Sequence, residues 1–466
     1  MGDGGKPAMG GLAGAAAILL LSGSAAGAQP MPGMAMPSSS AAPDAPPTPS
    51  APAANTSDVL AGMGRSGMGG MNMSSMQGDL AAYPALRDAS GTSWQPDSSP
   101  MEGVMGEAYG WSLMAHGYAT LDYDDQGGPR GDQKTFVETM FMGMAQRPLG
   151  GGTFTLRAMG SLDPLMGARG YPLLLGTGET PDGKTELVDR QHPHDLAMEL
   201  AGVYSHPIQR DLSGFLYVGW PGEPAIGPVT YMHRFSGIAN PEAPIDHHWL
   251  DSTHITFGVV TGGLVWRDWK LESSWFKGRE PNQFRYDFDH PRLDSWSLRL
   301  SWNPSPDWSL QVSRAHLKSP EQLDPAQDQD RTTASATYNK AYRIKGVVGD
   351  WQTTFAWGRD ADSPGITSDA YLLESAAALG RHTLFARAEN VSKNELFADD
   401  PDSPLYGRVF NVSKYSVGYF YTLPFARVYG VDVGGLASRY SLPSALNVTY
   451  GSNPASFMLF TRVKLR

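Results

Sequence analysis

The chain has 466 residues, of which 18% are charged and 10% aromatic, and it contains 54 glycines. It is longer than an ordinary soluble domain, and this composition is typical of a large β structure. The absence of cysteine excludes disulfide frameworks, thiolate zinc sites and cysteine nucleophiles. The formal net charge of −11 argues against nucleic acid as a partner and is compatible with a lumen that attracts cations.

The first 28 residues are predicted to be an export signal. Lys6 precedes an apolar run from Leu12 to Leu21, and Ala26-Gly-Ala28 fits a small-residue cleavage site. The alternative is a single membrane anchor, for which the run is shorter than the roughly 20 residues that a spanning helix needs. No later stretch is apolar enough for a spanning helix, so a membrane location would require strands.

Residues 29–108 are predicted to be a disordered periplasmic leader. This segment is rich in Pro, Ser, Ala, Gly and Met and nearly free of Val, Ile and Phe, so it cannot bury enough apolar surface to offset its ordering entropy. Its methionines are candidate ligands because flexible thioethers bind soft cations such as Cu(I). The alternative is a low-complexity tail in which methionine is incidental. The candidates are Met31, Met34, Met36, Met63, Met68, Met71, Met73 and Met76.

Residues 109–466 are predicted to form an all-β, transmembrane antiparallel barrel of about sixteen strands, with fourteen or eighteen as alternatives. Each segment is close to the roughly 9–11 residues of a tilted transmembrane strand. The expected strands are 109–123, 134–147, 153–163, 196–206, 213–220, 253–265, 268–278, 293–303, 307–317, 331–341, 350–359, 370–379, 381–390, 409–422, 425–439 and 455–465.

The stretch Trp296–Trp302 carries the clearest period-two pattern. Tryptophan and leucine fall on one face, while serine, arginine and asparagine fall on the other. A barrel with lipid outside and a polar interior explains many such segments better than a soluble sandwich does. Tryptophans near the predicted strand ends, including Trp249, Trp266 and Trp302, are the expected interfacial girdle.

The connections between the predicted strands alternate between short turns and long polar loops. Short turns occur at 148–152, 207–211 and 304–306, and long loops at 164–195, 221–252 and 279–292. This alternation is typical of an outer-membrane barrel, which has short periplasmic turns and long external loops.

Histidines concentrate in these long loops, beside carboxylates. The metal-ligand candidates are His192, His194, His247, His248 and His254, and His233 and His290 lie in the same loops. All seven are expected at one mouth of the barrel. Imidazole beside carboxylate can form a metal site, with the carboxylate as a ligand or as the group that orients the ring.

Two other interpretations of these loops remain open. The first is a structural network of ion pairs that includes Arg190, Arg234 and the nearby aspartates. The second is rim hydrolysis, which is disfavoured because the G-x-S-x-G motif is absent, so the chain is not expected to be an enzyme. The pore-lining candidates are Arg299, Arg387, Glu389, Asp195, Asp246 and Asp251.

With these strands and loops, residues 109–466 resemble a bacterial outer-membrane β-barrel. The runs Asp189–Asp195 and Asp246–Gly258 are similar to those of uncharacterised proteobacterial barrel proteins. The methionine-rich leader followed by a barrel resembles the outer-membrane copper resistance protein B family. That resemblance implies capture of copper by the leader thioethers in the periplasm and sequestration or export through the barrel.

The leading functional prediction is therefore copper or soft-cation tolerance at the outer membrane. The alternative is a general diffusion porin for small solutes, with the leader as a tether. Outer-membrane lipid and small ions or solutes are the expected partners, and a homotrimer is expected from the fold class alone.

Overall fold

The structure is a computed structural model that describes residues 77–425 and 429–465. These residues belong to one compact unit, residues 54–466. Among them, no helix has both the length and the apolar character to cross a membrane.

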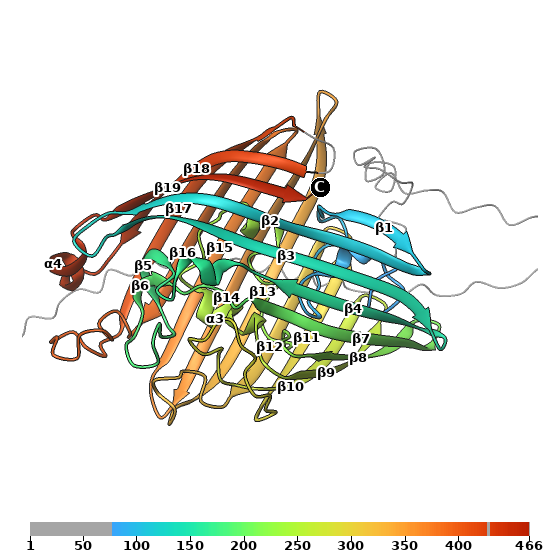
Figure 1. Ribbon diagram of the computed structural model, residues 1–466, viewed down its shortest axis with the longest axis horizontal. Coiled ribbons are helices and arrows are strands. Elements are labelled where there is room, and N and C mark those ends of the chain that lie inside the picture. The colour runs from blue at the N-terminus through green and yellow to red at the C-terminus, as the bar shows by residue number, and fades with distance from the viewer. Residues whose placement is uncertain (1–76, 426–428, 466) are drawn as a thin grey trace, which may run out of the picture. The chain divides into compact units, whose positions relative to one another are not determined.

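Sixteen antiparallel strands form a closed barrel (Figure 1). Each strand pairs with the next, and the last closes on the first through the register Ser456↔Gln126 to Lys464↔Tyr118. The barrel strands are β2 (Trp111–Gln126), β3 (Gln133–Leu149), β4 (Gly152–Gly160), β7 (Ala197–Gln209), β8 (Leu212–Gly219), β9 (Val259–Trp266), β10 (Trp269–Phe276), β11 (Ser295–Ser305), β12 (Trp308–Leu317), β13 (Asp328–Ile344), β14 (Val347–Ser363), β15 (Thr367–Leu379), β16 (His382–Lys393), β17 (Phe410–Leu423), β18 (Tyr429–Ser441) and β19 (Ala455–Leu465). The predicted number is confirmed, and every predicted range overlaps one of these strands.

Short elements lie outside the ring of barrel strands or within its loops. Strand β1 pairs only with the beginning of β2, and β5 and β6 form a separate two-stranded sheet. These elements are η2 (Ala85–Arg87), β1 (Val104–Ala108), η3 (Asp163–Met166), β5 (Tyr171–Thr177), β6 (Val188–Gln191), α2 (Phe235–Ile238), α3 (His247–Leu250), η4 (Ser252–His254), η5 (Ser444–Leu446) and α4 (Asn447–Tyr450).

The two faces of β11 follow the predicted alternation. Trp296 and Leu298 are 45% and 47% exposed, and they lie on the outer face. Arg299 and Asn303 are buried on the inner face. The same alternation of buried and exposed residues runs along β10, β16 and β19, so the outer wall is apolar, as lipid contact requires.

Aromatic side chains border the short-turn end of the barrel. Trp269 on β10 stacks on Trp302 of β11 with ring centroids 4.7 Å apart, and Tyr338 contacts both Trp308 and Trp351. This row confirms the expected interfacial girdle there. The prediction was wrong for Trp249, which lies buried in α3 inside the barrel and donates its indole N–H to Ser368.

The loop between β8 and β9, residues 220–258, fills much of the lumen. Its helix α2 lies against the inner faces of β14 and β15. Its helix α3, labelled in Figure 1, lies against β13, β14 and β15. Ser236 illustrates the contact: its N–H donates to Gln352, and its hydroxyl lies 2.8 Å from that of Thr354. The inner wall is polar because it forms hydrogen bonds with this folded loop.

Residues 77–103 also pack inside the barrel, although the leader was predicted to be disordered as far as residue 108. Asn339 on β13 donates to the carbonyl of Ser98 at 2.7 Å, and Arg157 on β4 donates to that of Ala89 at 2.9 Å. Trp94 is buried among them. Disorder is therefore the wrong prediction for residues 77–108, because partners on the distant inner wall satisfy this polar segment.

Candidate metal site

Five histidines from two long loops converge at the long-loop end of the barrel. His192 and His194 follow β6, His247 and His248 lie in α3, and His254 ends η4. Their rings form a closed circle of neighbours. The centroid separations are 6.4 Å for 192 to 194, 5.4 Å for 194 to 254, 5.2 Å for 254 to 247, 5.9 Å for 247 to 248 and 6.2 Å for 248 to 192. We call these five residues the histidine ring.

In three members of the histidine ring, Nδ1 lies within hydrogen-bond distance of an oxygen atom. His194 Nδ1 lies 2.8 Å from Asp163 Oδ2, and His247 Nδ1 lies 2.6 Å from Asp251 Oδ1. His254 Nδ1 lies 2.9 Å from the main-chain carbonyl of Asp251. Because these acceptors require a proton on Nδ1, they leave the lone pair on Nε2.

The Nε2 atoms of these same residues, His194, His247 and His254, are buried and have no hydrogen-bond partner among residues 77–425 and 429–465. An imidazole oriented by an oxygen on Nδ1, with a bare Nε2, is the usual arrangement of a metal-binding histidine. A buried polar atom without a partner is costly, and a bound cation would remove that cost. The donor set therefore fits a transition-metal ion.

Carboxylates extend the histidine ring on the side of His192 and His248. Ligand atoms of His248, Glu280 and Glu321 all lie within 4.8 Å of one another, the only such group of histidine and carboxylate ligands among the described residues. Glu179 lies 3.3 Å from His192 Nε2. The bare Nε2 atoms do not form so compact a group, so an ion bound there would draw the rings together.

Burial keeps members of the histidine ring neutral. Burial, and then the neighbouring His248, lowers the pKa of His192 to about 3. Burial also lowers the pKa of His254 well below its ordinary value, and that of His247 despite the opposing charge of Asp251. Neutral imidazoles at neutral pH offer lone pairs rather than positive charge.

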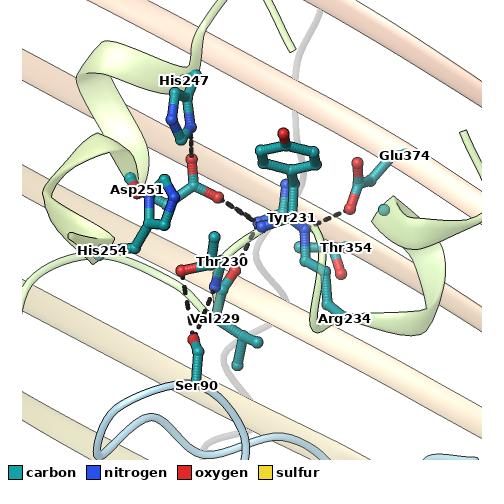
Figure 2. Close-up of polar contacts among 12 residues, drawn as sticks. Ser90, Val229, Thr230, Tyr231, Arg234, His247, Asp251, His254, Thr354 and Glu374 are labelled. Atoms are coloured by element: carbon teal, nitrogen blue, oxygen red, sulfur yellow. Dashed lines mark hydrogen bonds and ion pairs between the residues drawn. The ribbon is translucent and has the colours of Figure 1, made fainter. Parts of the chain in front are cut away.

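A buried ion-pair network lies beside the histidine ring (Figure 2). Arg234 Nη1 donates to Asp251 Oδ2 at 2.7 Å, and its Nε donates to Glu374 on the barrel wall. The N–H of Tyr231 also donates to Asp251 at 2.9 Å. Of the predicted network, the Arg234–Asp251 pair is present, whereas Arg190 pairs with Asp132. Asp251 connects this pair to the histidine ring through His247.

The predicted pore-lining residues lie on the inner side of the barrel, but folded chain covers them. Arg299 donates to Glu272 at 2.9 Å and to Thr92 at 3.0 Å, and Arg387 donates to the carbonyl of Glu242 at 2.7 Å. Side chains that hold inward-folded segments in this way do not border open water. The remaining candidates, Glu389, Asp195, Asp246 and Asp251, are also buried.

The structure separates the other two loop histidines from the histidine ring. His233 contacts Met159 deeper in the barrel, so the expectation that all seven lie at one mouth was wrong for His233, and His290 is exposed in the loop after β10. The eight leader methionines, from Met31 to Met76, lie outside the described residues. Sequence reasoning missed Asp163 and Glu179, which lie in the same long loop as His192 but carry no local motif. It also missed Glu280 and Glu321, which lie in other loops.

No protein-family model matches this sequence, and no curated protein matches it. Solved structures with a similar fold include an anion-selective porin from Comamonas acidovorans, 11% identical, with a TM-score of 0.45 over 76% of this chain and 99% of that chain. OmpF of Salmonella typhi, solved with daunomycin, is 7% identical, with a TM-score of 0.45 over 78% and 100%. OmpT of Vibrio cholerae, expressed in the outer membrane, is 8% identical, with a TM-score of 0.38 over 78% and 100%.

Proposed function

We propose that this protein is a porin-type channel of the outer membrane, narrowed by its own loops, that binds transition-metal cations at the histidine ring. The observation that carries the proposal is the set of three buried Nε2 atoms that have no partner in the described part of the chain, on imidazoles whose Nδ1 atoms are already held. Closure of the barrel and its apolar outer wall support the membrane location.

Burial of the inner wall distinguishes this proposal from the general diffusion porin. Glu374, Gln352 and Arg299 face the barrel interior, yet they are at most 1% exposed. In a wide water-filled pore such side chains would contact solvent. We therefore propose a restricted passage for small cations rather than free diffusion of solutes.

Imidazole and carboxylate ligands suit borderline cations such as Zn²⁺, Cu²⁺ and Ni²⁺. His194, His247 and His254 would hold the ion, and Asp163 and Asp251 would keep the rings oriented. Copper tolerance belongs to this proposal as its biological role, and capture of Cu(I) by the leader stays a prediction. The similar solved structures fit the general diffusion porin better than they fit copper tolerance. None of them shows copper tolerance. The homotrimer also stays a prediction.

The test is single-channel conductance of the full-length protein in planar bilayers, with Zn²⁺ or Cu²⁺ added on the long-loop side. We expect reversible block by micromolar metal in the natural protein. His254→Asn keeps an amide N–H near the position of Nδ1 and removes Nε2, so block should weaken by about tenfold or more. The control is His382→Asn, because His382 is exposed at the short-turn end and contacts Tyr419.

Equal metal sensitivity of His254→Asn and His382→Asn would overturn the histidine ring as the binding site. A large conductance that metal does not change would identify a general diffusion porin. Equilibrium dialysis of the same variants against Zn²⁺ measures binding without conductance, so loss of channel activity does not leave the proposal undecided.

A further inference from the structure

A row of imidazole and thioether side chains crosses the inner wall of strands β2, β3 and β4. His116 on β2 is the direct register partner of Met142 on β3, and Met142 is the partner of Met159 on β4. Paired residues on one face of adjacent antiparallel strands have Cβ atoms about 5 Å apart. The three side chains therefore lie side by side, closer to the short-turn end than the histidine ring.

The lumen loop adds a fourth side chain to this row. His233 Nε2 lies 3.3 Å from Met159 Sδ, and His116 Nε2 lies 3.1 Å from Met142 Sδ. The two imidazole rings meet edge to face with centroids 5.6 Å apart. Two nitrogen–sulfur pairs therefore lie next to each other. One pair lies within the barrel wall, and the other joins the wall to the lumen loop.

A cavity of about 280 Å³ adjoins the row. His116, His233 and Met142 line it, and further thioethers of Met114, Met144 and Met232 lie in the same wall. The interior of a barrel channel is ordinarily polar, so this concentration of methionine is a departure. Thioethers here add neither the charge nor the hydrogen-bond donors of an ordinary polar lumen, but they do add soft ligands.

We infer that His116, Met142, Met159 and His233 form a binding site for a soft monovalent cation, Cu(I) or Ag(I). Thioether sulfur selects such ions over Zn²⁺ or Mg²⁺, and imidazole also binds them. With metal bonds of about 2.0 Å to nitrogen and about 2.3 Å to sulfur, two ligands of a trigonal ion lie about 3.7 Å apart. The observed distances from Nε2 to Sδ are shorter than this value. Small rotations about the methionine side-chain bonds would widen them, at little cost in an unbranched side chain.

This inference deepens the proposed function, on which it rests, by naming the class of cation that reaches the interior. The loop of residues 220–258 supplies three members of the histidine ring. It also supplies His233 to the row that contains His116, Met142 and Met159, which we call the thioether row. The two sites differ in ligand chemistry: borderline divalent ions suit the first, and soft monovalent ions suit the second.

The test is a Cu(I) titration of the full-length protein in detergent, under reducing conditions, in competition with a calibrated chelator. The Met142→Leu, Met159→Leu double variant keeps side-chain volume and removes both sulfurs, and such swaps usually leave a core folded. The control is Met458→Leu, a buried methionine on β19 that is not part of the row. The leader methionines are unchanged in all three proteins, so any Cu(I) that they bind is the same in each titration.

We expect the double variant to bind one equivalent of Cu(I) fewer than the natural protein and the Met458→Leu control. Crystals soaked in Ag(I) should show an anomalous peak between His116 Nε2 and Met142 Sδ. Equal stoichiometry, or no peak at that position, would overturn the site and leave N–H···S hydrogen bonds only. The His254→Asn conductance result is independent of these measurements, so the two failures are distinguishable.

Discussion

His247 and His254 face each other with ring centroids 5.2 Å apart, and the single residue Asp251 holds both Nδ1 atoms. The carboxylate of Asp251 accepts from His247, and its main-chain carbonyl accepts from His254. One residue therefore sets the orientation of two rings and, through Arg234, ties them to the barrel wall. The fold of the loop and the geometry of the proposed metal site depend on the same contacts.

Asp251→Asn is therefore expected to weaken both folding and metal binding. The substitution keeps the shape but removes the charge beside the fully buried Arg234, which should cost about 2 kcal/mol or more in the free energy of unfolding. Urea titration in lipid vesicles, followed by tryptophan fluorescence, measures that loss. The control is Asp330→Asn, whose ion pair with Arg314 is solvent-exposed and should contribute less than about 1 kcal/mol. Equal stability of the two variants would contradict the role of Asp251.

The strands were predictable from the sequence because lipid contact imposes a period of two on every one of them. Trp296 and Leu298 could be placed on the outer face from spacing alone. The convergence of the histidines was partly predictable, because two neighbouring long loops emerge at the same end of a barrel. The partners of these histidines were not, since Glu280 and Glu321 lie in other loops whose inward fold no local pattern encodes.

The inward methionines of β3 have a clear signal in the sequence. Met140, Met142 and Met144 alternate along one predicted strand, on the face opposite Phe141. The period of two alone therefore places these methionines on the inner face of the barrel. Composition alone wrongly predicts disorder for residues 77–103, because their partners, such as Asn339, lie far along the chain.

The outer wall of β11 should reject charge. Leu298 lies on the outer face near the middle of its strand, so Leu298→Arg should destabilise the barrel by about 2–4 kcal/mol in lipid vesicles. Val448 in α4 is 92% exposed and lies in a loop, so Val448→Arg should change stability by less than about 0.5 kcal/mol. Unfolding titrations compare the two directly. Similar losses would mean that the outer face of β11 does not contact lipid.

Residues 77–103 should limit the conductance of the channel, because they occupy the lumen near the short-turn end. Arg299 of β11 and Asn339 of β13 both donate to this segment, and Trp94 is buried within it. Deleting residues 78–100 should therefore raise single-channel conductance severalfold, since the inner wall would become wet. Arg299 also donates to the carbonyl of Gly227 in the lumen loop, so this loop keeps that contact as well as those of Ser236 with the wall.

The matched control for this deletion is removal of residues 40–62, a leader stretch of the same length that contains no methionine. It should leave conductance unchanged, because the segment that packs on the inner wall is intact. Both proteins are first checked for folding by their resistance to unfolding in detergent at room temperature. If both folded deletions conduct like the natural protein, the passage for ions does not run past residues 77–103. If only the first deletion conducts more, that segment restricts the passage for ions.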